Sequence, residues 1–171
     1  PPRPNAYIED DTLSLRRNLT TEPRLVSFKK DGSVGVRLTG GNEVGIFVTT
    51  VQPGSSAALQ GLVPGDKLLK VNNMNMRGLT KEDAVLYMLN VQDQIDLVVQ
   101  YCKEEYDGVV ASGKEDSFYV RTHFNYDGTA KGEMSFNSGE VFHVIDTLYN
   151  GLVGSWLVYR LSRKSEIQKG I

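Results

Sequence analysis

The chain has 171 residues, of which 40% are hydrophobic and 23% are charged, and its formal net charge at pH 7 is −2. This length allows one mid-sized hydrophobic core or two small ones, and the near-neutral charge without a basic block excludes the electrostatic footprint of a nucleic-acid-binding protein. Cys102 is the only cysteine, which excludes an internal disulfide and a cysteine-based zinc site and indicates a cytoplasmic protein. We expect no metal and no cofactor. No apolar run approaches the roughly 20 residues of a membrane-spanning helix.

The first 23 residues differ in composition from the rest. They combine early prolines with the acidic run 9–11 and the basic pair Arg16 and Arg17, and they show little apolar periodicity. Such a composition does not supply enough apolar surface to form a core. We predict a linker or tail over residues 1–23.

Alternating apolar residues then predict a mainly β domain over residues 24–102. Thr80 is the expected N-cap of a helix over residues 81–90, with Asp83 at the third helical position. Ser55 to Gly61 predict one short helical turn that ends at the glycine. The expected strands cover residues 24–28, 34–39, 45–51, 67–71 and 95–101.

A glycine turn before the second expected strand is the most informative feature of this domain. It leaves the backbone N–H groups of Val34, Gly35 and Val36 uncovered beside an apolar strand face, which suits a carboxylate next to an apolar side chain. We expect a peptide to place its C-terminal carboxylate on these groups and to add a strand beside residues 36–39. Its last side chain would enter a pocket formed by Val34, Val36, Leu38 and Met88. In the alternative interpretation, the glycines only make turns.

A charged connector over residues 103–115, with at most one helical turn around residues 106–110, precedes a second pattern of short strands. These strands are expected at residues 117–124, 133–136, 141–145 and 155–160, and they predict a small barrel. The segment from Gly108 to Lys114 spells a phosphate-binding signature, but Glu115 replaces the Ser or Thr that would hold magnesium, and no apolar strand precedes it. We therefore expect no enzymatic activity.

Several motifs resemble known interaction domains. Ser33 to Val36 resemble the carboxylate-binding loop of PDZ domains, and Gly65 to Asn72 resemble their G-D-x-I-L-x-V-N strand. The second half resembles an SH3 domain, in the segments 122–126, 134–136, 138–140 and 156–157. The resemblance implies a PDZ domain of five to six strands with two helices over residues 24–102. It also implies an SH3-like barrel over residues 116–171 that lacks its final strand, because the SH3 ending breaks off after Gly170 and Ile171.

Residues 40–48, 121–124 and 146–151 further resemble the zonula occludens branch of the membrane-associated guanylate kinase scaffolds, at the third PDZ domain and the SH3 domain. This resemblance implies a scaffold on the cytoplasmic side of the plasma membrane at cell–cell junctions. The implied partners are the C-terminal tails of junctional membrane proteins of the adhesion-molecule type, and the guanylate kinase module of the same parent chain.

The resemblance also implies the residues of the peptide site. Lys29 takes the place of a basic residue that assists the carboxylate, and Lys81 and Val85 flank the pocket for the third residue from the peptide's end. Because Lys81 offers no acceptor to a Ser or Thr hydroxyl, we expect a hydrophobic or acidic residue there and an aliphatic final residue. The predicted site comprises Lys29, Ser33, Val34, Gly35, Val36, Arg37, Leu38, Lys81, Val85 and Met88.

The SH3 half leaves two further interpretations open. Phe124, Tyr126 and Trp156 form a weak candidate surface for proline-rich segments. Alternatively, the missing final strand leaves an unpaired edge, through which the chain would assemble with another segment or form a homodimer.

Overall fold

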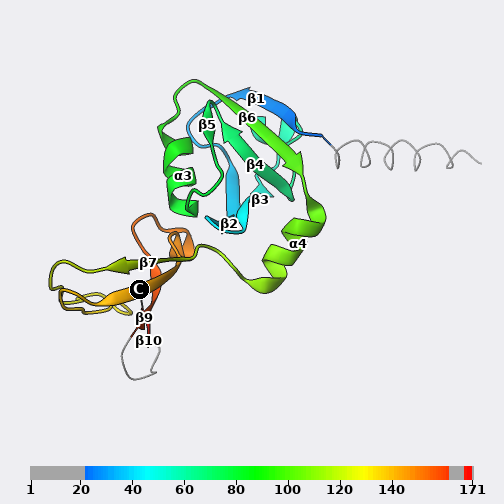
Figure 1. The fold of residues 1–171 in the computed structure, drawn as a ribbon. Helices are drawn as coiled ribbons and strands as arrows, with labels where there is room; N and C mark the ends of the chain where they lie inside the picture. Colours follow the sequence, from blue (N-terminus) through cyan, green and yellow to red (C-terminus); the bar gives the residue numbers. More distant parts are fainter. Residues whose placement is uncertain (1–21, 162–167, 171) are drawn as a thin grey trace, which may run out of the picture.

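The chain forms two β-domains joined by a helix (Figure 1). The computed structural model describes residues 22–161 and 168–170, so the predicted linker lies outside the described residues up to residue 21. Among the helices of the described part, none is long and apolar enough to cross a membrane. The same residues contain no group of His, Cys, Asp and Glu side chains suited to holding a metal ion.

The first domain is a six-stranded antiparallel sheet with two helices, which confirms the predicted mainly β architecture. The strand order is β1-β6-β4-β3-β2, with β5 paired to β4, so β2 is an edge strand of this sheet. The strands are β1 (Arg24–Lys29), β2 (Val36–Gly41), β3 (Gly45–Val51), β4 (Asp66–Val71), β5 (Met74–Asn75) and β6 (Gln94–Tyr101). The helices are α2 (Ser56–Leu59) and α3 (Lys81–Asn90).

Local sequence signals account for the ends of these elements. The Thr80 side chain accepts a hydrogen bond from the N–H of Asp83 at 3.2 Å, which confirms the predicted cap of α3. The strand that was expected to start at Val34 starts at Val36 instead. The reason is Gly35, whose φ of +71° is not a strand conformation.

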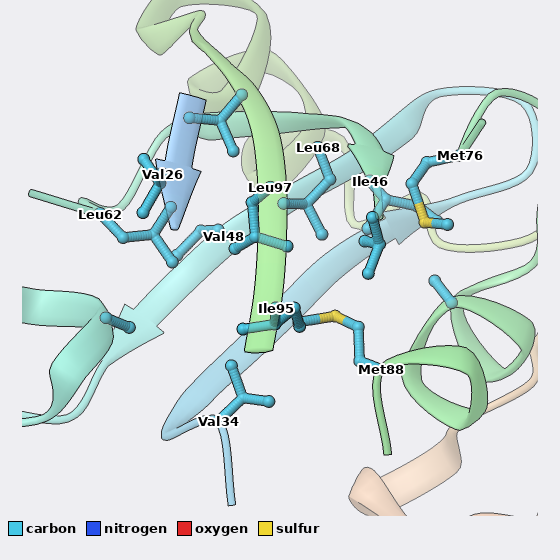
Figure 2. Packing of buried hydrophobic residues seen from close by; sticks show 14 of the residues in the cluster. Val26, Val34, Ile46, Val48, Leu62, Leu68, Met76, Met88, Ile95 and Leu97 are labelled. Atoms are coloured by element: carbon cyan, nitrogen blue, oxygen red, sulfur yellow. The ribbon is translucent and has the colours of Figure 1, made fainter. Parts of the chain in front are cut away.

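The core of the first domain lies between the sheet and its helices. Figure 2 shows Met88 of α3 extending toward Ile95 of β6, with Val34 close by. Val34 and Met88 are buried, and both also belong to the predicted peptide pocket. The packing that stabilises the domain therefore also fixes the floor of the candidate site.

The connector contains a ten-residue helix, α4 (Lys103–Ser112), rather than the single turn that was expected. The Tyr106 ring lies 6.1 Å from that of Phe47, and its hydroxyl is 2.7 Å from the hydroxyl of Thr49, so α4 is fixed to β3. Gly113 ends the helix with a φ of +65°. The phosphate-binding signature therefore spans the C-terminal half of a helix, where carbonyl groups are exposed, and phosphate groups prefer helix N-termini.

The second domain is a four-stranded antiparallel sheet of order β10-β9-β8-β7. Its strands are β7 (Phe118–Arg121), β8 (Val141–Asp146), β9 (Leu157–Leu161) and β10 (Gln168–Gly170), with the short helix η1 (Tyr149–Gly151) after β8. The strand that was expected over residues 133–136 is reduced to one bridge between Phe136 and Tyr126. Within the described residues, β7 is an edge strand, in agreement with an SH3-like barrel without its final strand.

Candidate peptide-binding groove

A groove of about 530 Å³ lies between the edge strand β2 and helix α3. The loop before β2 closes one end of it, and α3 contributes Val85, Met88 and Leu89 to its lining. Its lining residues are Ser33, Val34, Gly35, Val36, Arg37, Leu38, Thr50, Gln52, Pro53, Val85, Met88 and Leu89.

The loop at the closed end carries free hydrogen-bond donors. Among the described residues, the N–H groups of Val34 and Gly35 donate to no acceptor. The N–H of Gln52 donates to the Gly35 carbonyl at 2.8 Å, which anchors the loop to the end of β3. The φ of +71° at Gly35 strains any other residue, and a Cβ there would crowd the Gln52 side-chain oxygen and the Ser55 Cβ, both at 3.3 Å. The loop thus presents adjacent N–H groups to an acceptor brought by a ligand.

The floor of the groove is apolar. Val34 and Met88 are buried, whereas Val36, Leu38 and Val85 are half-buried and remain accessible. An aliphatic side chain placed there would lose contact with water, which contributes roughly 1.5 to 3 kcal/mol for a fully buried Val or Leu.

The wall formed by β2 has one unpaired edge. β2 pairs only with β3, in a register that shifts between Arg37 and Leu38, and α3 faces its other side. The backbone groups of such an edge are open to an added strand. Free N–H groups, an apolar floor and an open strand edge together suit an extended peptide with a free C-terminus.

Two of the predicted residues lie outside the groove, whereas all the others line it. Lys29 lines a smaller adjoining hollow of about 290 Å³, which shares Ser33, Val34 and Gly35 with the groove. Lys81 is buried, and its ammonium lies 2.9 Å from Glu115 and 3.1 Å from Asp146. Burial opposes its charged form, but the hydrogen bond and charge of Glu115, with those of Asp146, raise the pKa of Lys81 above its ordinary 10.5.

Sequence reasoning missed several groove residues and one that supports α3. Leu89 belongs to the apolar stripe of α3, and Gln52 and Pro53 enter the groove because of the β2–β3 register. The Lys30 ammonium donates to the carbonyls at the end of α3, those of Met88, Leu89 and Val91, at 2.9, 2.7 and 2.8 Å. A cation at a helix C-terminus satisfies its unpaired carbonyls and holds this wall in place.

The second domain contacts the first at the N-terminus of α3. In Figure 1, the orange segment after β8 lies beside this end of the helix. The Thr147 hydroxyl accepts a hydrogen bond from the N–H of Glu82 at 3.0 Å. The Glu82 carboxylate in turn accepts from the Gly154 N–H at 2.8 Å and from the Trp156 indole N–H at 3.2 Å. These bonds hold the second domain against the start of α3.

The weaker SH3 candidate surface coincides with a second cavity of about 540 Å³. Phe124, Tyr126 and Trp156 line it together with barrel residues such as Val120 and Phe142. The Tyr126 hydroxyl donates to Glu133 at 2.6 Å. This bond, followed by those from the N–H groups of Ala130 and Thr129, lowers the pKa of the Glu133 carboxyl from 4.5 to about 2.

Family comparisons identify both halves of the chain. Residues 24–100 match the model of the PDZ domain, and residues 119–166 match that of a variant SH3 domain. The chain is therefore a tandem of two protein-interaction modules, a PDZ domain followed by an SH3 domain.

Relatives that match most of this chain identify its family within this class of proteins. Tight junction protein 1 of Mus musculus is 44% identical over 171 residues, covering 98% of this chain and 10% of its own length. Tight junction protein 2 of Homo sapiens is 45% identical over 150 residues, covering 86% and 12% respectively. Tight junction protein ZO-3 of Homo sapiens is 40% identical over 164 residues, covering 91% and 18%. The chain belongs to this zonula occludens, or tight junction protein, family and spans between 10% and 18% of the length of these relatives.

Proposed function

We propose that this chain is a scaffold module that holds the C-terminal tails of junctional membrane proteins in its PDZ groove. The observation that carries the proposal is the pair of free N–H groups, on Val34 and Gly35, at the closed end of an apolar groove beside an unpaired strand. Together with the family, it supports a site of action on the cytoplasmic side of the plasma membrane at cell–cell junctions. The bound tails are of the adhesion-molecule type.

The groove favours a hydrophobic residue at the third place from the peptide's end. The Lys81 ammonium, which was expected to favour an acidic residue there, already pairs with two carboxylates. The position is bordered instead by Val85 and Leu38, neither of which offers a hydrogen bond to a Ser or Thr hydroxyl. We therefore expect peptides with Phe or Leu at this place to bind more tightly than those with Asp, Ser or Thr.

Fluorescence anisotropy of labelled peptides tests this function. Peptides with an aliphatic last residue, varied at the third place from the end, are compared with the same peptides carrying a C-terminal amide. We expect amidation to weaken binding at least about tenfold, because a charged hydrogen bond to the loop contributes about 1.5 to 3 kcal/mol. Equal affinity of free and amidated peptides would contradict the proposal, and tighter binding of the Asp peptide would contradict the argument about Lys81.

The edge strand β7 supports a second function, assembly through the SH3 half. The second cavity, which Phe124, Tyr126 and Trp156 line, also reaches the barrel residues Val120 and Phe142. Such a cavity is expected where a barrel lacks one of its strands. An added strand from the guanylate kinase module of the parent chain, or from a second copy, would complete the sheet. Binding of proline-rich segments is the less favoured alternative, because the indole N–H of Trp156 already donates to Glu82.

Sedimentation equilibrium checks assembly between copies. We expect a concentration-dependent homodimer that is weakened by Val120→Lys, which places a charge in the cavity. The control is Val110→Lys, at an exposed position of α4. A strict monomer across the concentration range of the peptide titration would contradict homodimerisation.

A further inference from the structure

Arg37 is an exposed cation on the edge strand β2. It borders the groove, and it is exposed between Val36 and Leu38, which are both half-buried. In the part of the chain that the structure describes, its guanidinium has no hydrogen-bond acceptor and no ion-pair partner. The charge of Arg37 is therefore available to a carboxylate that a ligand brings.

The two ends of β2 set the direction in which a peptide strand is added. The loop that receives the peptide's carboxylate lies directly before Val36, where β2 begins, so the peptide runs toward the start of β2 and is antiparallel to it. Directly opposed residues of an antiparallel pair place their side chains on the same face of the sheet. With its side chain in the groove, the last residue lies opposite Val36. The penultimate residue then lies opposite Arg37, and the third from the end lies opposite Leu38.

The irregularity in the pairing of β2 with β3 does not disturb this register. Arg37 pairs with Thr50 and Leu38 pairs with Val48, so the extra residue, Thr49, belongs to β3. β2 therefore keeps its alternation and directs Arg37 to the face opposite the groove floor. The cross-strand neighbour of Arg37 on that face, Thr50, is exposed and carries no charge, so it leaves the guanidinium uncompensated.

The fourth place from the peptide's end meets a charge of the opposite sign. This place lies opposite Thr39 of β2, on the same face as the penultimate place. The Glu115 carboxylate accepts hydrogen bonds from the Thr39 hydroxyl at 3.1 Å and from the Gly40 N–H at 2.8 Å. An acidic side chain at the fourth place would therefore approach a carboxylate, and like charges on neighbouring strands are unfavourable.

We propose that Arg37 is a specificity-determining residue of the groove, which selects an acidic side chain at the penultimate place of the bound peptide. The inference rests on the proposed function of the groove and adds the charge of the ligand at one place. An exposed pair of opposite charges on neighbouring strands is a modest interaction, which corresponds to about a two- to fivefold difference in affinity. Because this pair is exposed to solvent, the difference should decrease as the salt concentration rises.

Fluorescence anisotropy with the full chain at low salt tests the proposal. The probes are free-acid peptides with Val as the last residue and Phe third from the end, and they carry Asp, Asn or Lys at the penultimate place. Asn has the shape of Asp without its charge. We expect the Asp peptide to bind about two- to fivefold more tightly than the Asn peptide, and the Lys peptide to bind more weakly than both. The same exchange of Asn for Asp at the fourth place should bring no gain.

Arg37→Glu separates charge selection from a structural role of this residue. The variant should reverse the order and bind the Lys peptide more tightly than the Asp peptide, whereas Arg37→Lys should keep the preference for Asp. These orders compare peptides on one protein, so a general loss of affinity does not produce a reversal. The matched control is Arg77→Glu, which makes the same change in net charge at an exposed residue outside the groove lining. It should keep the order of the unchanged chain.

The outcomes distinguish this inference from the function on which it rests. Equal affinity of the Asp and Asn peptides for the unchanged chain would overturn the role of Arg37 and leave the proposed function standing. So would an unchanged order in Arg37→Glu, or a reversal in Arg77→Glu, which would assign the preference to net charge. If the unchanged chain binds none of the free-acid peptides, the proposed function fails as well.

Discussion

Replacing Asp66 by alanine is expected to lower the free energy of unfolding of the PDZ domain by about 3 kcal/mol. The Asp66 side chain is fully buried at the start of β4 and accepts hydrogen bonds from both terminal nitrogens of Arg24, at 2.8 and 2.6 Å. It also accepts from the N–H of Val63 at 2.9 Å. Removing the carboxylate leaves a partly buried guanidinium and a backbone donor without this partner, and breaking a buried pair from one side is more costly than removing both charges.

Urea unfolding followed by circular dichroism measures this loss. Asp107→Asn is the control, because the Lys103–Asp107 pair is exposed and such pairs contribute about 0 to 1 kcal/mol. A double variant, Arg24→Leu with Asp66→Ala, should recover part of the loss, since no unpaired charge remains. A loss for Asp66→Ala as small as that of the control would show that Arg24 is adequately solvated without its partner.

The parts of the site that the sequence predicts are those with a local signature. Val34, Gly35 and Val36 are contiguous, so a glycine turn followed by a strand of alternating apolar residues is enough to predict their role in the site. Met88 follows from the helical period and from the Thr80 cap, which places the helix start correctly, whereas Val85 was assigned to the site by the resemblance to PDZ domains. Thr50, Gln52 and Pro53 require in addition the pairing register of β2 with β3, which no local pattern encodes.

The contact between the two domains illustrates what local patterns miss. Asp116 and Thr147 are 31 positions apart in the sequence, and Lys81 is 35 positions before Asp116, yet all three are buried together. Polar residues scattered in this way have no periodicity, and each alone resembles a solvated loop residue. Lys81 was assigned to the groove by its place in the PDZ pattern, but the structure places its ammonium between Glu115 and Asp146.

Replacing Lys81 by methionine is expected to destabilise the docked arrangement by about 3 kcal/mol at neutral pH. Methionine keeps the length and most of the apolar stem, so the main change is that Glu115 and Asp146, both partly buried, lose their common cation. NMR relaxation should then report more independent tumbling of the PDZ and SH3 halves, and urea unfolding should report the lost stability. The double variant Lys81→Met with Glu115→Gln leaves one fewer unpaired carboxylate and should regain part of it.

The ion pairs of Lys81 with Glu115 and Asp146 also predict how the docked arrangement responds to alkaline pH. Because the partners raise the pKa of Lys81 above 10.5, the folded state binds its proton more tightly than the unfolded chain does. This stabilisation is fully present below pH 10.5 and is lost as the pH rises through the folded-state value. The difference in stability between the unchanged chain and Lys81→Met should therefore be constant near neutrality and shrink above that value. A difference that instead shrinks on acidification alone would assign the stabilisation to the carboxylates and not to the ammonium that they share.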